Sequence, residues 1–148
     1  MELADRLKQY EGTKQYQQSR GMFRNDKFYQ YYDSLGKPTI GYGHLLTNSE
    51  VYPYGISEDK ANALLNQDIK IARMQYYKLE LDLPQDWQDF MIIMIFQLGY
   101  AGVLKFKKMI AALKAKDYKE AIKQAKDSLW YKQTPNRLNQ MIEVLTNK

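Results

Sequence analysis

The apolar residues of the chain recur at helical spacing over several stretches. Near the N-terminus they share one face of residues 2–11, and Gly12 can close that helix in a left-handed conformation. From Ser57, which can cap a helix, an apolar stripe continues to about residue 79. Residues 85–98 are apolar almost all round, which predicts a central buried helix that Gly99 ends.

The C-terminal part of the chain keeps the helical pattern. It predicts two helices, over about residues 102–115 and 118–130, and Asp117 resembles the start of a capping box. A last helix is expected to begin with Thr134 as its N-cap and Pro135 at the first helical position.

The segment between the first two helical stretches has another character. Residues 13–29 are polar and aromatic with no clear period, which favours a loop or an irregular turn. Residues 30–43 place aromatic and β-branched residues around a turn with glycine and proline, and this pattern predicts a β-hairpin.

Together these elements predict an α+β fold in a single domain over residues 1–148. A small β lobe is expected at about residues 13–56, and a larger helical lobe from residues 1–12 and 57–148. Two lobes joined by a long helix imply a cleft between them, which is a favoured place for a ligand.

Composition excludes several classes of protein. There is no cysteine and one histidine, so neither a disulfide framework nor a zinc site is expected, and no cofactor is implied. The most apolar run, residues 90–98, is too short to span a membrane, and no signal peptide precedes it. We therefore expect a soluble chain that does not enter the membrane.

The formal net charge of +5 favours anionic partners. Nucleic acid, acidic lipid and acidic cell-wall polymer all fit, and so does a charge that serves only solubility. Nucleic-acid binding rests on this charge alone, because the sequence contains no recognised motif for it.

Two carboxylates are candidates for chemistry. Glu11 ends the first predicted helix, where the helix dipole raises its proton affinity and suits it to act as a general acid; the alternative is an exposed residue at a helix end. Asp33 stands at the mouth of the hairpin and Thr39 on the returning strand, although both are also ordinary turn and strand residues. Two carboxylates that face each other are what glycoside hydrolysis requires.

Other polar residues favour structural roles. His44, the lone histidine, is expected to form an ion pair with Asp68, which would raise its pKa. Gln97 and Trp130 could line a sugar site, and packing in the core is the alternative for Trp130.

Several motifs appear in order along most of the chain: "YEG", "YYDSLGKPTIGYGHLLT", "LLNQD", "FQLGYAGVLKF" and "DSLWYKQTPNR". This combination resembles the phage T4 lysozyme family of muramidases, glycoside hydrolase family 24. Both free endolysins and the lysozyme domains of T4-like tail baseplates carry it. The resemblance implies cleavage of the β-1,4 bond between N-acetylmuramic acid and N-acetylglucosamine in peptidoglycan.

The resemblance also implies roles for single residues. Glu11 would donate the proton, Asp33 would activate water with inversion, and Thr39 would help to hold that water. Arg137 would pair with Glu11, which lowers the pKa of Glu11 against the helix-end effect, and the sequence leaves open which effect is larger.

Five further residues match supporting positions of the family. Leu45 and Phe96 would contact the glycan. Gln97 and Trp130 would form a hydrogen-bonded pair behind the site, and His44 would form its ion pair with Asp68.

The sequence departs from the family pattern between Glu11 and Asp33, where the intervening segment is longer. This segment could loop out beside the site, cover it, or bind a partner. A monomer is expected. A free endolysin would wait in the host cytoplasm, depend on a phage holin and act in the periplasm, whereas a baseplate domain would belong to the virion tail. The alternative function is a non-catalytic module for wall binding or tail assembly.

Overall fold

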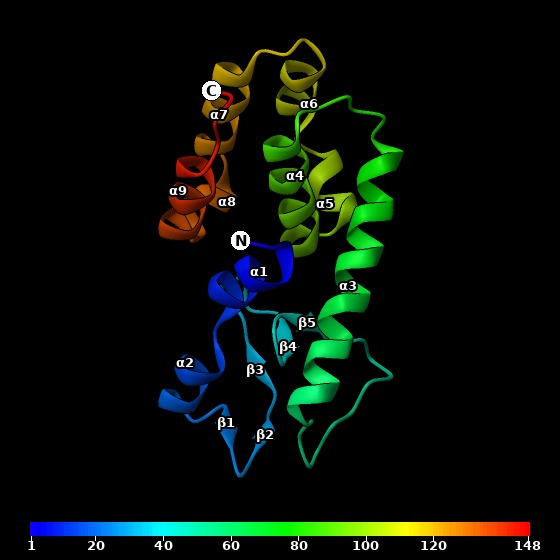
Figure 1. Ribbon diagram of the computed structural model, residues 1–148, viewed down its shortest axis with the longest axis vertical. Helices are drawn as coiled ribbons and strands as arrows, with labels where there is room; N and C mark the ends of the chain where they lie inside the picture. Colours follow the sequence, from blue (N-terminus) through cyan, green and yellow to red (C-terminus); the bar gives the residue numbers. More distant parts are fainter. The chain divides into compact units, whose positions relative to one another are not determined.

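In the first half of the chain two short helices are followed by five short strands and a long helix, whereas the second half is helical. The computed structural model describes residues 1–148 and divides into two units, Met1–Lys70 and Ile71–Lys148 (Figure 1). The division falls within the long helix α3 (Glu58–Lys78). The α+β class predicted from the sequence is confirmed, while the predicted lobe boundaries stay a prediction.

The first unit contains two small antiparallel sheets, of two and three strands. Its elements before α3 are α1 (Leu3–Glu11), α2 (Lys14–Ser19), β1 (Phe23–Arg24), β2 (Lys27–Phe28), β3 (Tyr31–Tyr32), β4 (Pro38–Ile40) and β5 (His44–Leu45). The hydroxyl of Ser57 accepts a hydrogen bond from the Lys60 N–H, so the predicted cap of α3 is confirmed.

The prediction of a loop over residues 13–29 was wrong. Thr13 caps α2 by accepting a hydrogen bond from the Tyr16 N–H, and β1 and β2 form a hairpin. Its two-residue loop, Asn25 and Asp26, has φ of 52° and 59°, values that these residue types tolerate best after glycine. Because the elements are so short, the segment shows no hydrophobic period.

The predicted hairpin of residues 30–43 is confirmed in its first two strands and extends into a third. Tyr31 lies opposite Thr39, and Ile40 lies opposite His44. The strand β4 is therefore the centre of the sheet, and its Thr39 and Ile40 are completely buried.

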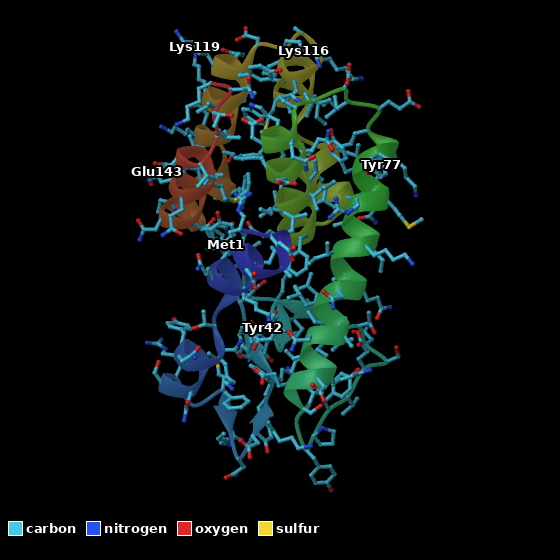
Figure 2. The ribbon with its side chains drawn as sticks, viewed as in Figure 1. Met1, Tyr42, Tyr77, Lys116, Lys119 and Glu143 are labelled. Atoms are coloured by element: carbon cyan, nitrogen blue, oxygen red, sulfur yellow. The ribbon has the colours of Figure 1, made fainter.

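Aromatic residues join the two-stranded hairpin to the rest of the first unit. The Phe28 ring packs against Phe23 at 4.6 Å between ring centroids and edge-on against Tyr42 at 5.1 Å. Tyr42 is labelled in Figure 2. Phe28 also exchanges two main-chain hydrogen bonds with Ile56, just before α3. The hairpin is thus part of the packed first unit.

The second unit is built around α4 (Gln85–Leu98), whose predicted bounds are confirmed. Five further helices complete it: α5 (Tyr100–Leu104), α6 (Lys107–Lys114), α7 (Tyr118–Lys126), α8 (Leu129–Gln133) and α9 (Pro135–Glu143). Trp87 of α4 is completely buried and stacks on Tyr118 of α7 at 5.6 Å. The apolar surface of α4 therefore organises this unit.

Two of the predicted helices are interrupted. The helix expected over 102–115 breaks between α5 and α6 at Phe106, whose ψ of 58° is not helical. The helix expected over 118–130 ends at Lys126, and Ser128 caps α8 by accepting a hydrogen bond from the Tyr131 N–H.

The caps of the second unit agree only in part with their predictions. Asp117 caps α7 by accepting a hydrogen bond from the Glu120 N–H, as its capping signal indicates. Thr134 does not cap α9 with its side chain, because its hydroxyl donates to the Trp130 carbonyl instead. Pro135 does occupy the start of α9.

None of the helices combines the length and the apolar character that crossing a membrane would require. The side chains also form no group of three or more histidine, aspartate or glutamate residues that could hold a metal ion.

Asp86 fastens the C-terminal segment to α4, and its removal should destabilise the second unit. Its carboxylate accepts hydrogen bonds from the main-chain N–H groups of Thr146 and Asn147. Although burial raises the pKa of Asp86, these bonds outweigh it and hold the pKa below its usual value. We expect Asp86→Ala to lower the free energy of unfolding by about 2 kcal/mol at neutral pH, measured by urea denaturation.

The matched control is Asp89→Ala on the same helix, since Asp89 accepts only a bond from the Gln85 side chain. Because the folded state lowers the pKa of Asp86, the difference between wild type and Asp86→Ala should shrink as the pH falls through that pKa. An equal loss in the two variants would contradict the role of Asp86.

Candidate functional site

Asp33 is held in the turn between β3 and β4 by its own carboxylate. Its Oδ1 accepts hydrogen bonds from the Leu35 N–H at 2.9 Å and the Lys37 N–H at 2.8 Å. Both bonds fall on one oxygen, so Oδ2 can accept from another donor, such as a water molecule. The half-buried carboxyl group is therefore fixed in orientation by main-chain donors.

Thr39 is connected to the same turn. Its hydroxyl donates to the Lys37 carbonyl at 2.8 Å, and the Asp33 N–H donates to that carbonyl at 3.0 Å. The hydroxyl oxygen keeps lone pairs that can accept a further hydrogen bond. The structure thus brings Asp33 and Thr39 together through Lys37, although Thr39 is completely buried.

Glu11 is the last residue of α1, as its sequence position indicates. Gly12 follows it with φ of 122°, a conformation that glycine adopts freely, and its N–H donates to the Lys8 carbonyl. The half-buried Glu11 therefore stands where the helix ends and the chain changes direction. Glu11, Asp33 and Thr39 all belong to the first unit.

His44 lies between two carboxylates. Its Nδ1 lies 2.7 Å from Asp68 Oδ2, which is the ion pair that the resemblance implies. Its Nε2 lies 2.8 Å from Glu50 Oε2, a partner that the sequence analysis missed. Glu50 also accepts a hydrogen bond from the Thr47 N–H. The signal in the sequence that could have identified Glu50 was its position three residues after Thr47, in the loop that follows β5.

The two carboxylates change the titration of His44. The hydrogen bond with Asp68 raises the pKa of His44 most strongly, burial opposes it, and Glu50 adds to the rise. The result is a pKa of about 8 against the usual 6.5. The His44 side chain is only 13% exposed, so little solvent screens these charges. His44 is charged at neutral pH and ties β5 to α3.

Gln97 and Trp130 meet in the second unit. Trp130 Nε1 donates to Gln97 Oε1 at 3.2 Å, the bond that the resemblance implies, and both side chains are buried. The Trp130 ring also packs edge-on against Phe90 and Phe106. The Gln97 amide nitrogen Nε2 is buried and has no acceptor.

The remaining predicted residues lie as follows. Leu45 is half buried on β5, opposite Thr39, and Phe96 is half buried on α4. Arg137 is half buried in the first turn of α9, as Pro135 at its start indicates.

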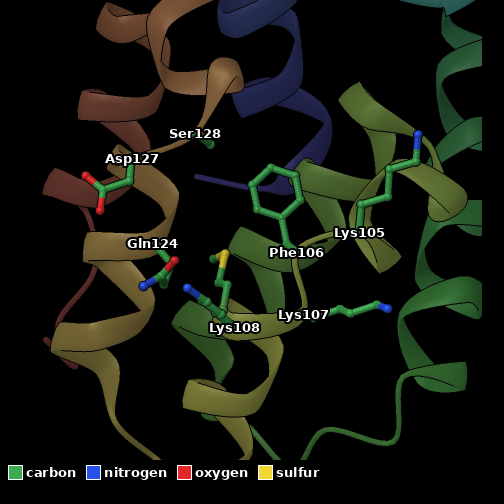
Figure 3. A pocket seen from close by; sticks show the side chains of 8 residues that line it. Lys105, Phe106, Lys107, Lys108, Gln124, Asp127 and Ser128 are labelled. Carbon is green, nitrogen blue, oxygen red and sulfur yellow. The ribbon is translucent and has the colours of Figure 1, made fainter.

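A pocket of about 420 Å³ opens in the second unit between the start of α6 and the end of α7. Figure 3 shows Phe106 at its centre, with Lys108 extending on the side of Gln124. The lining residues combine three lysines with apolar and polar groups: Lys105, Phe106, Lys107, Lys108, Met109, Gln124, Asp127 and Ser128. This lining suits a ligand with anionic or polar groups. None of the site residues predicted from the sequence lines this pocket.

The chain is similar to lysozymes of phage type. Residues 8–147 match the family described as phage lysozyme. The chain is 31% identical over 143 residues to the pre-baseplate central spike protein Gp5 of Enterobacteria phage T4. It is 29% identical over 147 residues to each of two probable T4-type lysozymes, 1 and 2, of Dictyostelium discoideum.

The matches differ in how much of each relative they cover. The match to the spike protein includes 78% of this chain but only 24% of the spike protein. The matches to the Dictyostelium proteins include 81% and 80% of this chain and 86% of each relative. The chain is thus similar to most of the length of two probable T4-type lysozymes and to about a quarter of the spike protein.

The His44 cluster should make stability depend on pH in the alkaline range. Folding raises the pKa of His44. Its contribution to the free energy of unfolding is therefore complete below pH 6.5 and is lost as the pH rises through about 8. The rise corresponds to about 2 kcal/mol of free energy of unfolding. Urea denaturation at a series of pH values from 6 to 9 measures it.

Glu50→Gln should reduce this alkaline decrease in the free energy of unfolding, and His44→Asn should abolish it. The matched control is Asp59→Asn at the first turn of α3, which removes a carboxylate elsewhere in the unit. A wild-type free energy of unfolding that does not decrease across this range would contradict the assignment.

Proposed function

The chain belongs to the phage lysozyme family, and on this premise we propose that it is a muramidase that cleaves peptidoglycan. Membership of the family supports a lysozyme-type glycoside hydrolase. The proposed target is the β-1,4 bond between N-acetylmuramic acid and N-acetylglucosamine, cleaved with inversion by a monomer. The observation that carries the proposal is the Asp33 carboxylate, fixed by main-chain donors and linked to Thr39.

Asp33 is proposed to act as the general base. A water molecule bound to its Oδ2 would attack the anomeric carbon and pass a proton to the carboxylate. The two hydrogen bonds on Oδ1 keep the carboxyl group from rotating during this step. Thr39 would contribute by accepting a hydrogen bond from the same water.

Glu11 is proposed to act as the general acid. It would protonate the glycosidic oxygen while the bond from that oxygen to the anomeric carbon breaks. No metal or cofactor is needed for this reaction.

Leu45, Phe96 and Gln97 are proposed to contact the glycan. Gln97 is proposed to line the glycan site, held in orientation by the hydrogen bond from Trp130 to its Oε1. Leu45 and Phe96 are half buried and would offer apolar contact to the sugar rings.

The match to part of a spike protein favours a second candidate, a tail-assembly or wall-binding module without catalysis. A free enzyme would be held in the host cytoplasm and would require a holin to reach the periplasm. A tail component would contact a baseplate protein and approach the wall from outside. Lysis by the isolated protein distinguishes an enzyme from a module without catalysis.

Purified protein should clear a suspension of chloroform-treated Gram-negative cells, followed by turbidity. Replacing either proposed catalytic carboxylate, by Glu11→Gln or Asp33→Asn, should reduce the rate by about 100-fold or more, since proton transfer then fails. Asparagine at position 33 retains an oxygen that can accept the Leu35 and Lys37 hydrogen bonds, so the turn should be preserved.

Asp5→Asn and Asp26→Asn are the matched controls. The first makes the same kind of change on the exposed face of α1, and the second changes the β1–β2 loop. Circular dichroism checks that all variants are folded. A folded wild type that does not clear cells, or a Glu11→Gln variant as fast as the controls, would overturn the proposal.

The stereochemistry of the product tests the proposed mechanism separately. Inversion at the anomeric carbon of a β-linked glycan gives the α-anomer as the first product. Proton NMR of a soluble peptidoglycan fragment, recorded before mutarotation, should show the α-anomer signal appear first. Initial release of the β-anomer would refute inversion without refuting hydrolysis.

A further inference from the structure

Gln17 is a buried amide in the segment that separates Glu11 from Asp33. It lies on α2, and its side chain is completely buried. Burying an amide is costly unless its donors and acceptors are hydrogen-bonded. The hydrogen bonds that the Gln17 side chain makes therefore indicate its role in the unit.

The Gln17 amide joins two main-chain positions that flank the candidate site. Its Nε2 donates to the Gly12 carbonyl at 3.0 Å and to the Gly41 carbonyl at 2.8 Å. Gly12 follows Glu11 directly, and Gly41 is two residues after Thr39. A single side chain thus connects the end of α1 with the turn that leaves β4.

The two glycines have different neighbours. Gly41 packs closely against α3, since a Cβ atom there would lie 3.2 Å from the Ala61 Cβ atom. The Tyr31 hydroxyl also donates to the Gly41 carbonyl, at 3.3 Å. Gly12, at φ of 122°, ends α1, and its N–H donates to the Lys8 carbonyl. The Gln17 amide therefore connects the end of α1 to a glycine that packs on α3.

Gln17 is itself held in place by the fold of its segment. Its carbonyl accepts a hydrogen bond from the Met22 N–H at 2.8 Å, and Thr13 caps the helix. After Met22 the chain enters the β1–β2 hairpin, which packs through Phe28 as described above. The amide is thus presented from a fixed backbone.

We propose that Gln17 is a positioning residue, which holds the backbone that follows Glu11 at a set distance from the strand of Thr39. This inference rests on the proposed hydrolysis, in which the acid and the water-holding strand must keep their separation. An error of about 1 Å in such a separation can cost about 100-fold in rate. The longer segment between Glu11 and Asp33 would then support the site from inside the unit.

The carbonyl oxygen of the Gln17 amide suggests a variant that tests the role of the amide nitrogen. Gln17 Oε1 is buried without a hydrogen-bond donor, so this oxygen contributes no hydrogen bond to stability. Methionine has a similar size and neither donors nor acceptors. Gln17→Met should therefore remove only the two hydrogen bonds to Gly12 and Gly41, so that it lowers stability through those bonds while the positions of Gly12 and Glu11 relax.

The test compares Gln17→Met with Phe23→Leu. Phe23 packs on Phe28 in the same segment and makes no bond to Gly12 or Gly41, so it reports a purely structural change. On soluble peptidoglycan fragments, we expect kcat of Gln17→Met to fall by about 10-fold or more with KM within about twofold. Phe23→Leu should lower Tm and leave kcat within about twofold of wild type.

Gln17→Glu adds a readout that a structural role would not produce. Its carboxylate would face two carbonyl oxygens and repel them, whereas the protonated acid can donate to one of them. The ratio of its kcat to that of wild type should therefore rise as the pH is lowered. A ratio that does not change with pH would contradict the role of the amide donor.

Hydrogen exchange separates this inference from the proposed function. The amides of Glu11 and Gly12 should exchange faster in Gln17→Met than in wild type or in Phe23→Leu. If wild type proves inactive, the proposed function fails and exchange alone decides whether Gln17 holds this backbone. Unchanged exchange, or a kcat loss no greater than that of Phe23→Leu, would overturn the inference.

Discussion

The first unit depends on the hydrogen bonds between Asp33 and Lys37. Strands β3 and β4 share only two residue pairs, and Pro38 in one of them has no N–H to donate. The ladder is thus too short to fix its own register. The Asp33 N–H donates to the Lys37 carbonyl and the Lys37 N–H donates to Asp33 Oδ1, so the turn sets the register instead.

Asp33 would therefore have two roles, and each uses a different oxygen of its carboxylate. Oδ1 holds the turn, while Oδ2 remains for the proposed water. An alanine at this position would remove both duties at once and would not identify the chemistry. An asparagine keeps an acceptor for the turn and loses the base, which is why the amide variant is the informative one.

The sequence predicted the elements whose signals are local. The bounds of α1, α3 and α4 follow from an apolar stripe that ends at a cap or a glycine, as at Ser57 and Gly99. The segment 13–29 lacked such a stripe because it buries few residues, and one of them is the polar Gln17. The break at Phe106 interrupts an apolar pattern that continues across it, so periodicity could not reveal it.

The site residues also divide into those that have a local signal in the sequence and those that have none. Asp33, Thr39 and His44 were identifiable because motif letters and turn chemistry place them within one hairpin. The residues that support them come from elsewhere in the chain. Glu50 bonds to His44 from a loop, and Gln17 bonds to Gly12 and Gly41 from α2. Hydrophobic periodicity cannot predict such bonds, because a single side chain that links two distant segments produces no repeated pattern in the sequence.

The longer segment between Glu11 and Asp33 is best understood by where its buried groups point. Gln17 and Phe28 bond to the backbone of residues outside the segment, at Gly41 and Ile56. A lid that moved over a site would have to break these bonds at each opening, and would leave buried carbonyl groups unsatisfied. The segment is therefore a fixed support of the first unit. If it alters which glycans are cleaved, it does so through the surface it presents and through the placement of Glu11.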